Sequence, residues 1–147
     1  MTAVCRGALP ADAEGILELK VKGQSSDWPF SIVNREKALA RITSLIDESI
    51  VVVCVEGDEI VGSIGFDAHE WWFSDDIFLC EVWTLIRADR RESTVPDMLL
   101  SRAKLLAEKA GTPMVVGIVS PKQAEQKNKL FRRHFTPVGE IFAHMGA

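Results

Sequence analysis

The stretch from residue 77 to residue 119 contains the pattern that most restricts the fold. An apolar run at Ile77–Ile86 is followed by a charged loop, and in residues 95–110 apolar side chains then recur every three or four positions. That period is typical of an amphipathic helix. Gly111 ends the helix, and residues 114–119 form a nearly continuous apolar run, typical of a strand with both faces covered. Two strands joined through a helix predict a right-handed β-α-β crossover, and therefore a fold of the α/β class.

The rest of the chain predicts the remainder of a mixed sheet. The clearest local prediction is a tight antiparallel hairpin, in which Gly57-Asp58 joins Ile50–Val55 to Ile60–Phe66. We expect a sheet that is antiparallel in its N-terminal half, with helices on both faces, in a single domain spanning residues 1–147. The other predicted elements are a strand at Val4–Arg6, helices at 9–23 and about 32–46, a strand at Trp71–Phe73, a helix from Pro121 to about His134, and a strand at Val138–His144.

Composition excludes several classes of protein. With 47% hydrophobic and 26% charged residues the chain is typical of a globular domain and not of a disordered one. A net charge of −4 argues against a nucleic-acid partner, since binding to a duplex needs a clustered cationic face. Two local basic patches suit a small anionic ligand better, although the second is equally well explained as a solvated helix face. They are Arg87, Arg90 and Arg91, and then Lys127, Lys129, Arg132 and Arg133.

The cysteines and the apolar runs indicate in which cellular compartment the chain is expected. Cys5, Cys54 and Cys80 are odd in number and widely spaced, and two of them lie in strand-like runs. We therefore expect buried free thiols in a reducing compartment rather than a disulfide framework or a metal site. We expect no signal peptide, because residues 1–9 lack a long apolar stretch, and no apolar run is long enough to cross a bilayer. These observations predict a cytoplasmic protein without a membrane partner.

The junction at residues 84–98 has the composition of an anion-binding loop. A strand ends there, a charged loop turns, and a helix begins with Thr94 as the expected N-cap and Asp97 completing a capping-box pair. A helix start offers unpaired backbone N–H groups and partial positive charge, which stabilise a phosphate. Capping residues alone do not distinguish such a site from an ordinary turn. The neighbouring pair Arg90 and Arg91 favours the anion.

This junction resembles the pyrophosphate loop of the GNAT acyltransferase family, which reads Arg/Gln-x-x-Gly-x-Gly/Ala and precedes a helix with a Leu-Leu pair. Arg91 matches the first position, Thr94 and Pro96 the two small residues, and Leu99-Leu100 the pair. The order of predicted elements agrees over nearly the whole length. The resemblance implies the GNAT fold and acetyl-coenzyme A as co-substrate. It implies these cofactor-binding residues: Thr84, Leu85, Ile86, Arg91, Glu92, Ser93, Thr94, Val95, Pro96, Asp97, Asn128 and Phe131.

The sequence departs from the family pattern in two places. Thr94 and Pro96 replace glycines, which adds bulk and removes one N–H donor, so we expect weaker coenzyme binding than in a standard member. The hydroxyls of Ser93 and Thr94 partly substitute as donors. Asn128–Phe131 resembles a motif whose tyrosine commonly protonates the departing thiolate, yet the chain has Phe131 there and no tyrosine anywhere. Plain core packing is the simpler role for Phe131.

Glu81 is the candidate general base, since it is the only acid in the apolar run Ile77–Ile86. Apolar neighbours raise the pKa of a carboxyl toward the range of a base. When the chain is aligned with the GNAT family on Arg91, Cys80 and not Glu81 falls at the strand position where several members carry a catalytic carboxylate. Glu81 then points to the opposite face of the sheet unless a bulge intervenes. A solvent-facing or arginine-paired glutamate is the competing interpretation. Weaker candidates are His69, Glu70 and His134, whose spacing gives no metal signature.

Two functions follow from the resemblance. The first is an acetyl-coenzyme A-dependent N-acetyltransferase that acts by direct transfer on an amine of a small molecule or a protein. The second is a catalytically degenerate GNAT-fold module that binds coenzyme A or a protein. The Trp71–Phe73 run is interpreted as core packing, as an acceptor groove or as a protein interface. A homodimer is left open.

Overall fold

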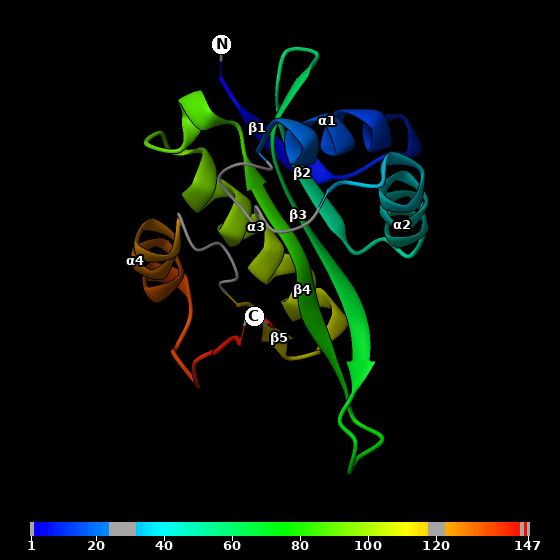
Figure 1. Cartoon of the computed structure of the whole chain (residues 1–147), viewed down its shortest axis with the longest axis vertical. Helices are drawn as coiled ribbons and strands as arrows, with labels where there is room; N and C mark the ends of the chain where they lie inside the picture. The colour runs from blue at the N-terminus through cyan, green and yellow to red at the C-terminus, as the bar shows by residue number, and fades with distance from the viewer. Residues whose placement is uncertain (1, 24–31, 118–122, 145, 147) are drawn as a thin grey trace.

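The computed structural model describes residues 2–23, 32–117, 123–144 and 146. Its centre is a five-stranded sheet in the order β1-β2-β3-β4-β5, antiparallel except for the parallel pair β4 and β5 (Figure 1). The strands are β1 (Val4–Gly7), β2 (Val51–Glu56), β3 (Glu59–Glu70), β4 (Ile77–Ile86) and β5 (Met114–Val115). The predicted α/β class and mixed sheet are confirmed.

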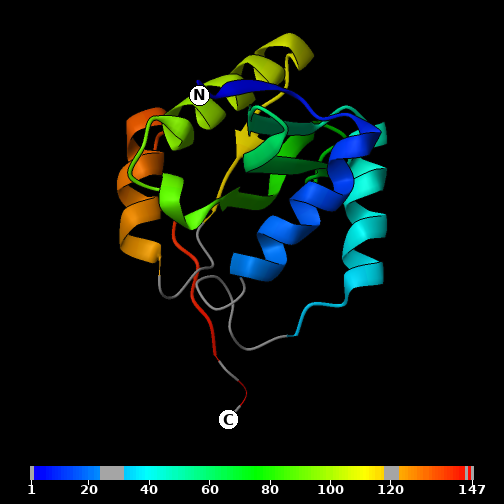
Figure 2. The ribbon, with the colours of Figure 1, turned by 90° about the horizontal axis from the view of Figure 1, so that it is seen from above.

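Helices cover both faces of the sheet, as Figure 2 shows from above. The helices α1 (Ala13–Gly23) and α2 (Arg35–Asp47) lie on one face, while α3 (Val95–Ala110) and α4 (Ala124–His134) lie on the other. Alternation along β2 builds both cores, because successive side chains of a strand point to opposite faces. Val51 and Val53 pack with the α1 and α2 side chains, whereas Val52 packs beneath α3.

Glycine residues in the sequence correctly predicted the β2–β3 turn and the end of α3. The β2–β3 hairpin turns at Gly57, whose φ of 62° is the left-handed conformation that glycine adopts without strain. Gly111 likewise ends α3 at φ 63°. The second helix starts at Arg35, three residues later than predicted, because the Asn34 side chain accepts from the backbone N–H of Lys37 at 3.0 Å.

Three strand predictions are wrong in extent or altogether. Trp71–Phe73 is not a strand, since β3 itself runs to Glu70 and the three aromatic residues form the turn into β4. The fifth strand pairs only at Met114–Val115, and residues 118–119 lie outside the described residues. Val138–His144 has apolar alternation but forms no strand, and Val138 and Phe142 are exposed. The described part of the last helix begins at Ala124, and the predicted start at 121 lies outside it.

The prediction of three free cysteines is also wrong. The register of β1 and β2 places Cys5 directly opposite Cys54, and the two form a disulfide. A sequence separation of 49 residues gives no indication of that pairing. Cys80 alone is free, and burial raises the pKa of its thiol. Within the described residues no helix combines the length and the apolar character needed to cross a membrane.

Candidate functional site

A cleft of about 680 Å³ opens where β4 ends, α3 begins and α4 packs alongside. The end of α1 closes one side of it through Leu19 and Gly23. Most of the residues implied by the family resemblance line this cleft, and they come from two elements and the loop between them. They are Thr84, Leu85, Ile86, Arg91, Glu92, Ser93, Pro96 and Asp97. The cleft therefore lies at the junction of residues 84–98 singled out in the sequence, although Thr94 and Val95 do not line it.

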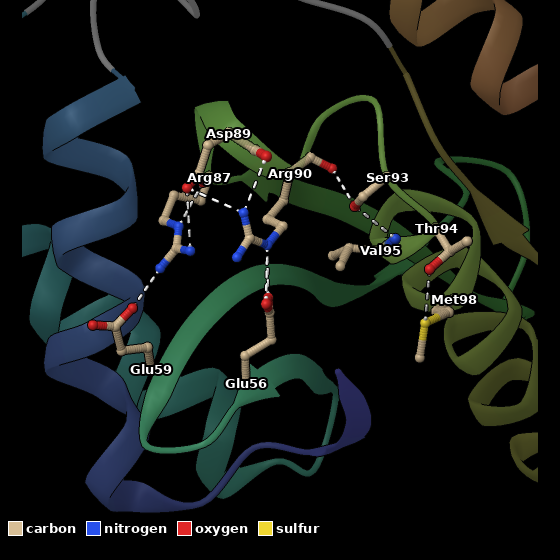
Figure 3. Close-up of polar contacts among 9 residues, drawn as sticks. All are labelled: Glu56, Glu59, Arg87, Asp89, Arg90, Ser93, Thr94, Val95 and Met98. Carbon is tan, nitrogen blue, oxygen red and sulfur yellow. Dashed lines mark hydrogen bonds and ion pairs between the residues drawn. The ribbon is translucent and has the colours of Figure 1, made fainter. Parts of the chain in front are cut away.

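Thr94 occupies the N-cap position of α3, as predicted, but its side chain makes no capping hydrogen bond and Ser93 supplies one instead. Ser93 Oγ accepts from the backbone N–H of Val95 at 3.1 Å, whereas the Thr94 hydroxyl donates to Met98 Sδ at 3.7 Å (Figure 3). Thr94 has helical backbone angles, so its side chain cannot act as an N-cap. Val95 is buried in the core. Asp97 completes no capping box, because its carboxylate binds α4 instead.

Fewer backbone donors are left at this helix start than in a glycine-rich loop. The N–H of Val95 is taken up by Ser93, and Pro96 has none. Binding of an anion here depends on the remaining backbone amides of the first turn and on cationic side chains. The Val95 N–H is thus a second donor that is taken up, beside the one that Pro96 lacks, and weaker coenzyme binding stays a prediction.

The arginines before the helix divide into two groups. Arg87 binds Glu59 at 2.5 Å and Asp89 at 2.7 Å, and Arg90 binds Glu56 at 2.7 Å (Figure 3). The hydrogen bond from Arg90 is the main reason that the pKa of Glu56 is lowered. These ion pairs tie the loop between β4 and α3 to the β2–β3 hairpin.

Arg91 differs from its two neighbours. It lines the cleft and makes no hydrogen bond or ion pair with any residue that the structure describes. The expected pair of anion-binding arginines is thus a single one, because the guanidinium of Arg90 is turned toward Glu56.

Glu81 is held between β4 and the chain that follows β5. Its carboxylate accepts a hydrogen bond from the backbone N–H of Gly117 at 2.9 Å and another from the Thr84 hydroxyl. Burial raises the pKa of Glu81, and the bonds from Thr84 and Gly117 and the charge of Lys127 oppose that rise. The interpretation of Glu81 as solvent-facing or arginine-paired is wrong.

A β-bulge gives Glu81 this orientation. Gly65 pairs with Trp83 and Phe66 pairs with Glu81, so Val82 is an extra residue on β4. A bulge of this kind reverses the facing of the residues beyond it. It brings Glu81 and Thr84 together although they are three residues apart. Glu81 itself does not line the cleft, but Thr84 does.

The α4 helix contributes different residues from those implied by the resemblance. Phe131 is buried in the core and meets Phe135 edge to face with ring centroids 6.3 Å apart, which confirms core packing. Asn128 accepts from Arg132 Nε at 2.5 Å, and neither Asn128 nor Phe131 lines the cleft. The side chain of Lys127 does line it, and its Nζ donates to the Thr84 carbonyl at 3.5 Å.

The basic run of α4 was the available sequence signal for these residues, with a solvated helix face as its competing interpretation. Lys127, Lys129 and Arg133 line the cleft together with Gln126. Arg133 also binds Asp97 at 3.1 Å, which joins α4 to the first turn of α3.

Among the described residues, none of the weaker base candidates makes a hydrogen bond with the Glu81 carboxylate. His69 pairs with Asp67 at 3.3 Å, and Glu70 is exposed at the end of β3. His134 Nε2 lies 2.7 Å from Asp97, beside the cleft. The described residues contain no group of three or more His, Cys, Asp or Glu side chains placed to hold a metal ion.

Comparison with known proteins places the fold. No protein-family model matches the sequence, and no curated protein is detectably similar to it. Among solved structures, the chain resembles yncA of Salmonella typhimurium, determined with its cofactor acetyl-CoA (19% identity, 90% of this chain, 78% of that chain, TM-score 0.73).

Two further neighbours match over nearly their whole length. One is an aminoglycoside acetyltransferase from an uncultured soil metagenomic sample (12% identity, 100% of this chain, 99% of that chain, TM-score 0.73). The other is a GCN5-related N-acetyltransferase from Ralstonia eutropha JMP134 (13% identity, 99% of this chain, 100% of that chain, TM-score 0.73). The chain therefore has the fold of the GNAT acetyltransferases, as its sequence predicted.

Proposed function

We propose that the chain is an acetyl-coenzyme A-dependent N-acetyltransferase, which transfers the acetyl group directly to an amine of a small molecule or a protein. The observation that supports this most is Arg91, which pairs with no described residue and lines a cleft of about 680 Å³ together with the first turn of α3. A guanidinium next to a helix start is suited to hold a diphosphate.

In this proposal the cleft binds the coenzyme with the first turn of α3 and the cations around it. Arg91 takes the phosphates, and Lys129 and Arg133 add positive charge from α4. The cleft is lined by four basic side chains, Arg91, Lys127, Lys129 and Arg133, against three acidic ones, Asp89, Glu92 and Asp97. Asp89 is also paired with Arg87, which lies outside the lining. The net field at the mouth therefore favours an anion.

Glu81 and Thr84 supply the proton acceptor. As the amine nitrogen bonds to the thioester carbonyl carbon and the C–S bond breaks, the amine proton passes to the Thr84 hydroxyl, whose own proton passes to Glu81. A raised pKa brings the carboxylate closer to the range that a general base needs near neutral pH. The departing thiolate takes its proton from solvent, because Phe131 stands at the position of the family's tyrosine and has no proton to donate.

A second function is favoured by a specific observation. The chain has no tyrosine, and Thr94 and Pro96 replace the glycines of the loop. A GNAT-fold module that binds coenzyme A or a protein without catalysis agrees with those losses. The amine acceptor, a cytoplasmic location and a homodimer remain predictions.

Two measurements in sequence test the proposal. Coenzyme A at about 100 times its dissociation constant should stabilise the chain against unfolding by roughly 2.7 kcal/mol. Absence of any shift at millimolar ligand would contradict both the enzyme and the coenzyme-binding module. If binding is observed, release of free thiol from acetyl-coenzyme A with a panel of amines supports the enzyme, and its absence across the panel supports the module.

A further inference from the structure

The turn between β3 and β4 carries aromatic side chains that nothing in the described chain covers. We call residues Glu70–Ile77 the hairpin tip. The exposed fractions of Trp72 and Phe73 are 94% and 68%, and Trp71 is 43% exposed. In Figure 1 the β3–β4 hairpin extends past the helices at the bottom of the view, so the tip stands clear of the sheet's packed faces. Soluble chains seldom expose contiguous aromatic surface without a binding role.

The tip is preorganised. Trp71 stacks on Phe78 with ring centroids 4.1 Å apart and on Phe73 at 6.1 Å, while Trp72 meets Phe73 edge to face at 5.6 Å. The backbone turn is closed by the Ser74 N–H, which donates to the Trp71 carbonyl at 3.2 Å. Rings held in this way lose little further freedom when they are covered, which favours binding.

The charged residues of the hairpin tip itself are all acidic, and His69, which precedes it, is paired with Asp67 at 3.3 Å. Glu70, Asp75 and Asp76 lie within the hairpin tip, and no Lys, Arg or His occurs between residues 70 and 86. None of the three carboxylates forms an ion pair with a described residue. An aromatic face with uncompensated carboxylates repels phosphate-rich surfaces and attracts Lys and Arg, which bind both by charge and by cation–π contact with indole rings.

We infer that the hairpin tip is a docking site for a basic polypeptide segment, whose Lys or Arg side chains stack on Trp72 and Phe73 and pair with Asp75 and Asp76. This site is separate from the cleft. The β4 strand joins them, and the nine steps from Ile77 to Ile86 span about 30 Å at the usual rise per strand residue. The inference therefore does not rest on the proposed acetyl transfer.

Binding of labelled synthetic peptides to the full chain tests the site. A Lys-Gly repeat peptide should bind, with an affinity that falls as salt is added, whereas a Glu-Gly repeat of the same length should not. Trp72→Ala combined with Phe73→Ala should weaken binding about tenfold, in line with the usual size of cation–π contacts. Asp75→Asn combined with Asp76→Asn should weaken it and flatten its salt dependence.

Matched controls lie on the exposed side of α3. Leu105→Ala removes a similarly exposed apolar side chain, with 46% of its surface accessible, and Glu108→Gln removes an exposed carboxylate. Both should leave peptide affinity unchanged. The tip variants should retain the melting temperature and the coenzyme A affinity of the parent chain. If the aromatic variant fails to fold, the double variant Asp75→Asn, Asp76→Asn still tests the site.

Several outcomes would overturn the inference. One is that the basic peptide does not bind, and another is that it binds with an affinity that neither tip variant changes. A third is that the acidic peptide, or zwitterionic lipid vesicles that contact Trp72, bind as well as the basic peptide. Self-association of the chain that the tip variants abolish would also overturn it, by showing that a second copy covers the rings.

Discussion

Glu81 is the residue at which burial has the clearest chemical consequence. Its carboxylate is fixed by the Gly117 N–H and by Thr84, and desolvation keeps its pKa above the ordinary carboxyl range. If it accepts the amine proton, kcat/KM must rise with pH as Glu81 loses its own proton. We expect Glu81→Gln to lower kcat/KM by roughly 10²–10⁴-fold and to abolish that rise. A pH–rate profile that keeps its acidic limb in this variant would remove Glu81 from the mechanism.

The same carboxyl affects stability, independently of any activity. Because its pKa is higher in the folded than in the unfolded chain, folding favours the protonated form. This contribution is complete below the unfolded pKa and is lost as pH rises through the folded one. Urea unfolding of the parent chain should therefore show a decline in that window that Glu81→Gln lacks. Glu108→Gln, which changes an exposed carboxyl, should leave the decline in place.

Lys127 acts on Glu81 through charge. Its ammonium lowers the pKa of Glu81 against the larger effect of burial. Lys127→Met removes that charge, so the pKa of Glu81 rises further and the acidic limb of the pH–rate profile moves to higher pH. The midpoint of the limb is the readout, since a change in coenzyme affinity alone alters the height of the profile and not its position. An unmoved midpoint would show that the two groups are not coupled.

Arg90 and Arg91 are adjacent in sequence, but we expect Arg91 to bind the coenzyme and Arg90 to hold the loop in place. Arg91→Gln should weaken coenzyme A binding roughly tenfold to a hundredfold, the usual effect of losing a charge-assisted hydrogen bond, and leave stability unchanged because Arg91 has no described partner. Arg90→Gln should instead loosen the loop from Glu56. Calorimetric titration of both variants checks this. Equal affinities for the two would mean that the loop has been misassigned.

At the scale of elements, the sequence predicted the helices and the first hairpin because their signals are local. Gly57 and Gly111 take left-handed angles, and the three-to-four-residue period of α3 is strong. Side-chain partners were less predictable. Thr94 and Ser93 are both good capping residues, and only the backbone angles of the turn select Ser93. The Glu81 orientation depended on a bulge at Val82, which one sequence cannot specify.

The capping assignment makes a direct prediction about α3. Ser93→Ala removes the acceptor for the Val95 N–H and should destabilise the chain by about 1 kcal/mol, the usual cost of losing an N-cap. Thr94→Ala should cost much less, since its hydroxyl only meets Met98 Sδ. Urea denaturation of the two variants measures the difference. A larger loss for Thr94→Ala would restore the cap that the sequence alone had predicted.

At the scale of the whole molecule, the wrong strand and cysteine predictions share one cause. Strand formation needs a partner, and partners are set by contacts that are distant in sequence. Trp71–Phe73 has strand-forming residues but falls where β3 turns into β4, and Val138–His144 alternates but pairs with none of the described strands. The Cys5–Cys54 pair was missed for the same reason, because it depends on the register of β1 against β2.

That disulfide determines how much of the stability depends on redox state. It closes a separation of 49 residues that includes α1 and α2, and the chain-entropy relation gives about 4 kcal/mol for a loop of this length. The oxidised chain should therefore unfold at higher urea than the reduced chain, and Cys5→Ser should abolish the difference. Cys80→Ser should leave it intact, because Cys80 is free. Three reactive thiols in the unreduced, denatured protein would contradict the pairing.

Reducing compartments keep such cysteines as thiols, so a chain that folds in the cytoplasm does so without the stabilisation of the disulfide. The reduced form is therefore the one whose coenzyme affinity should be measured.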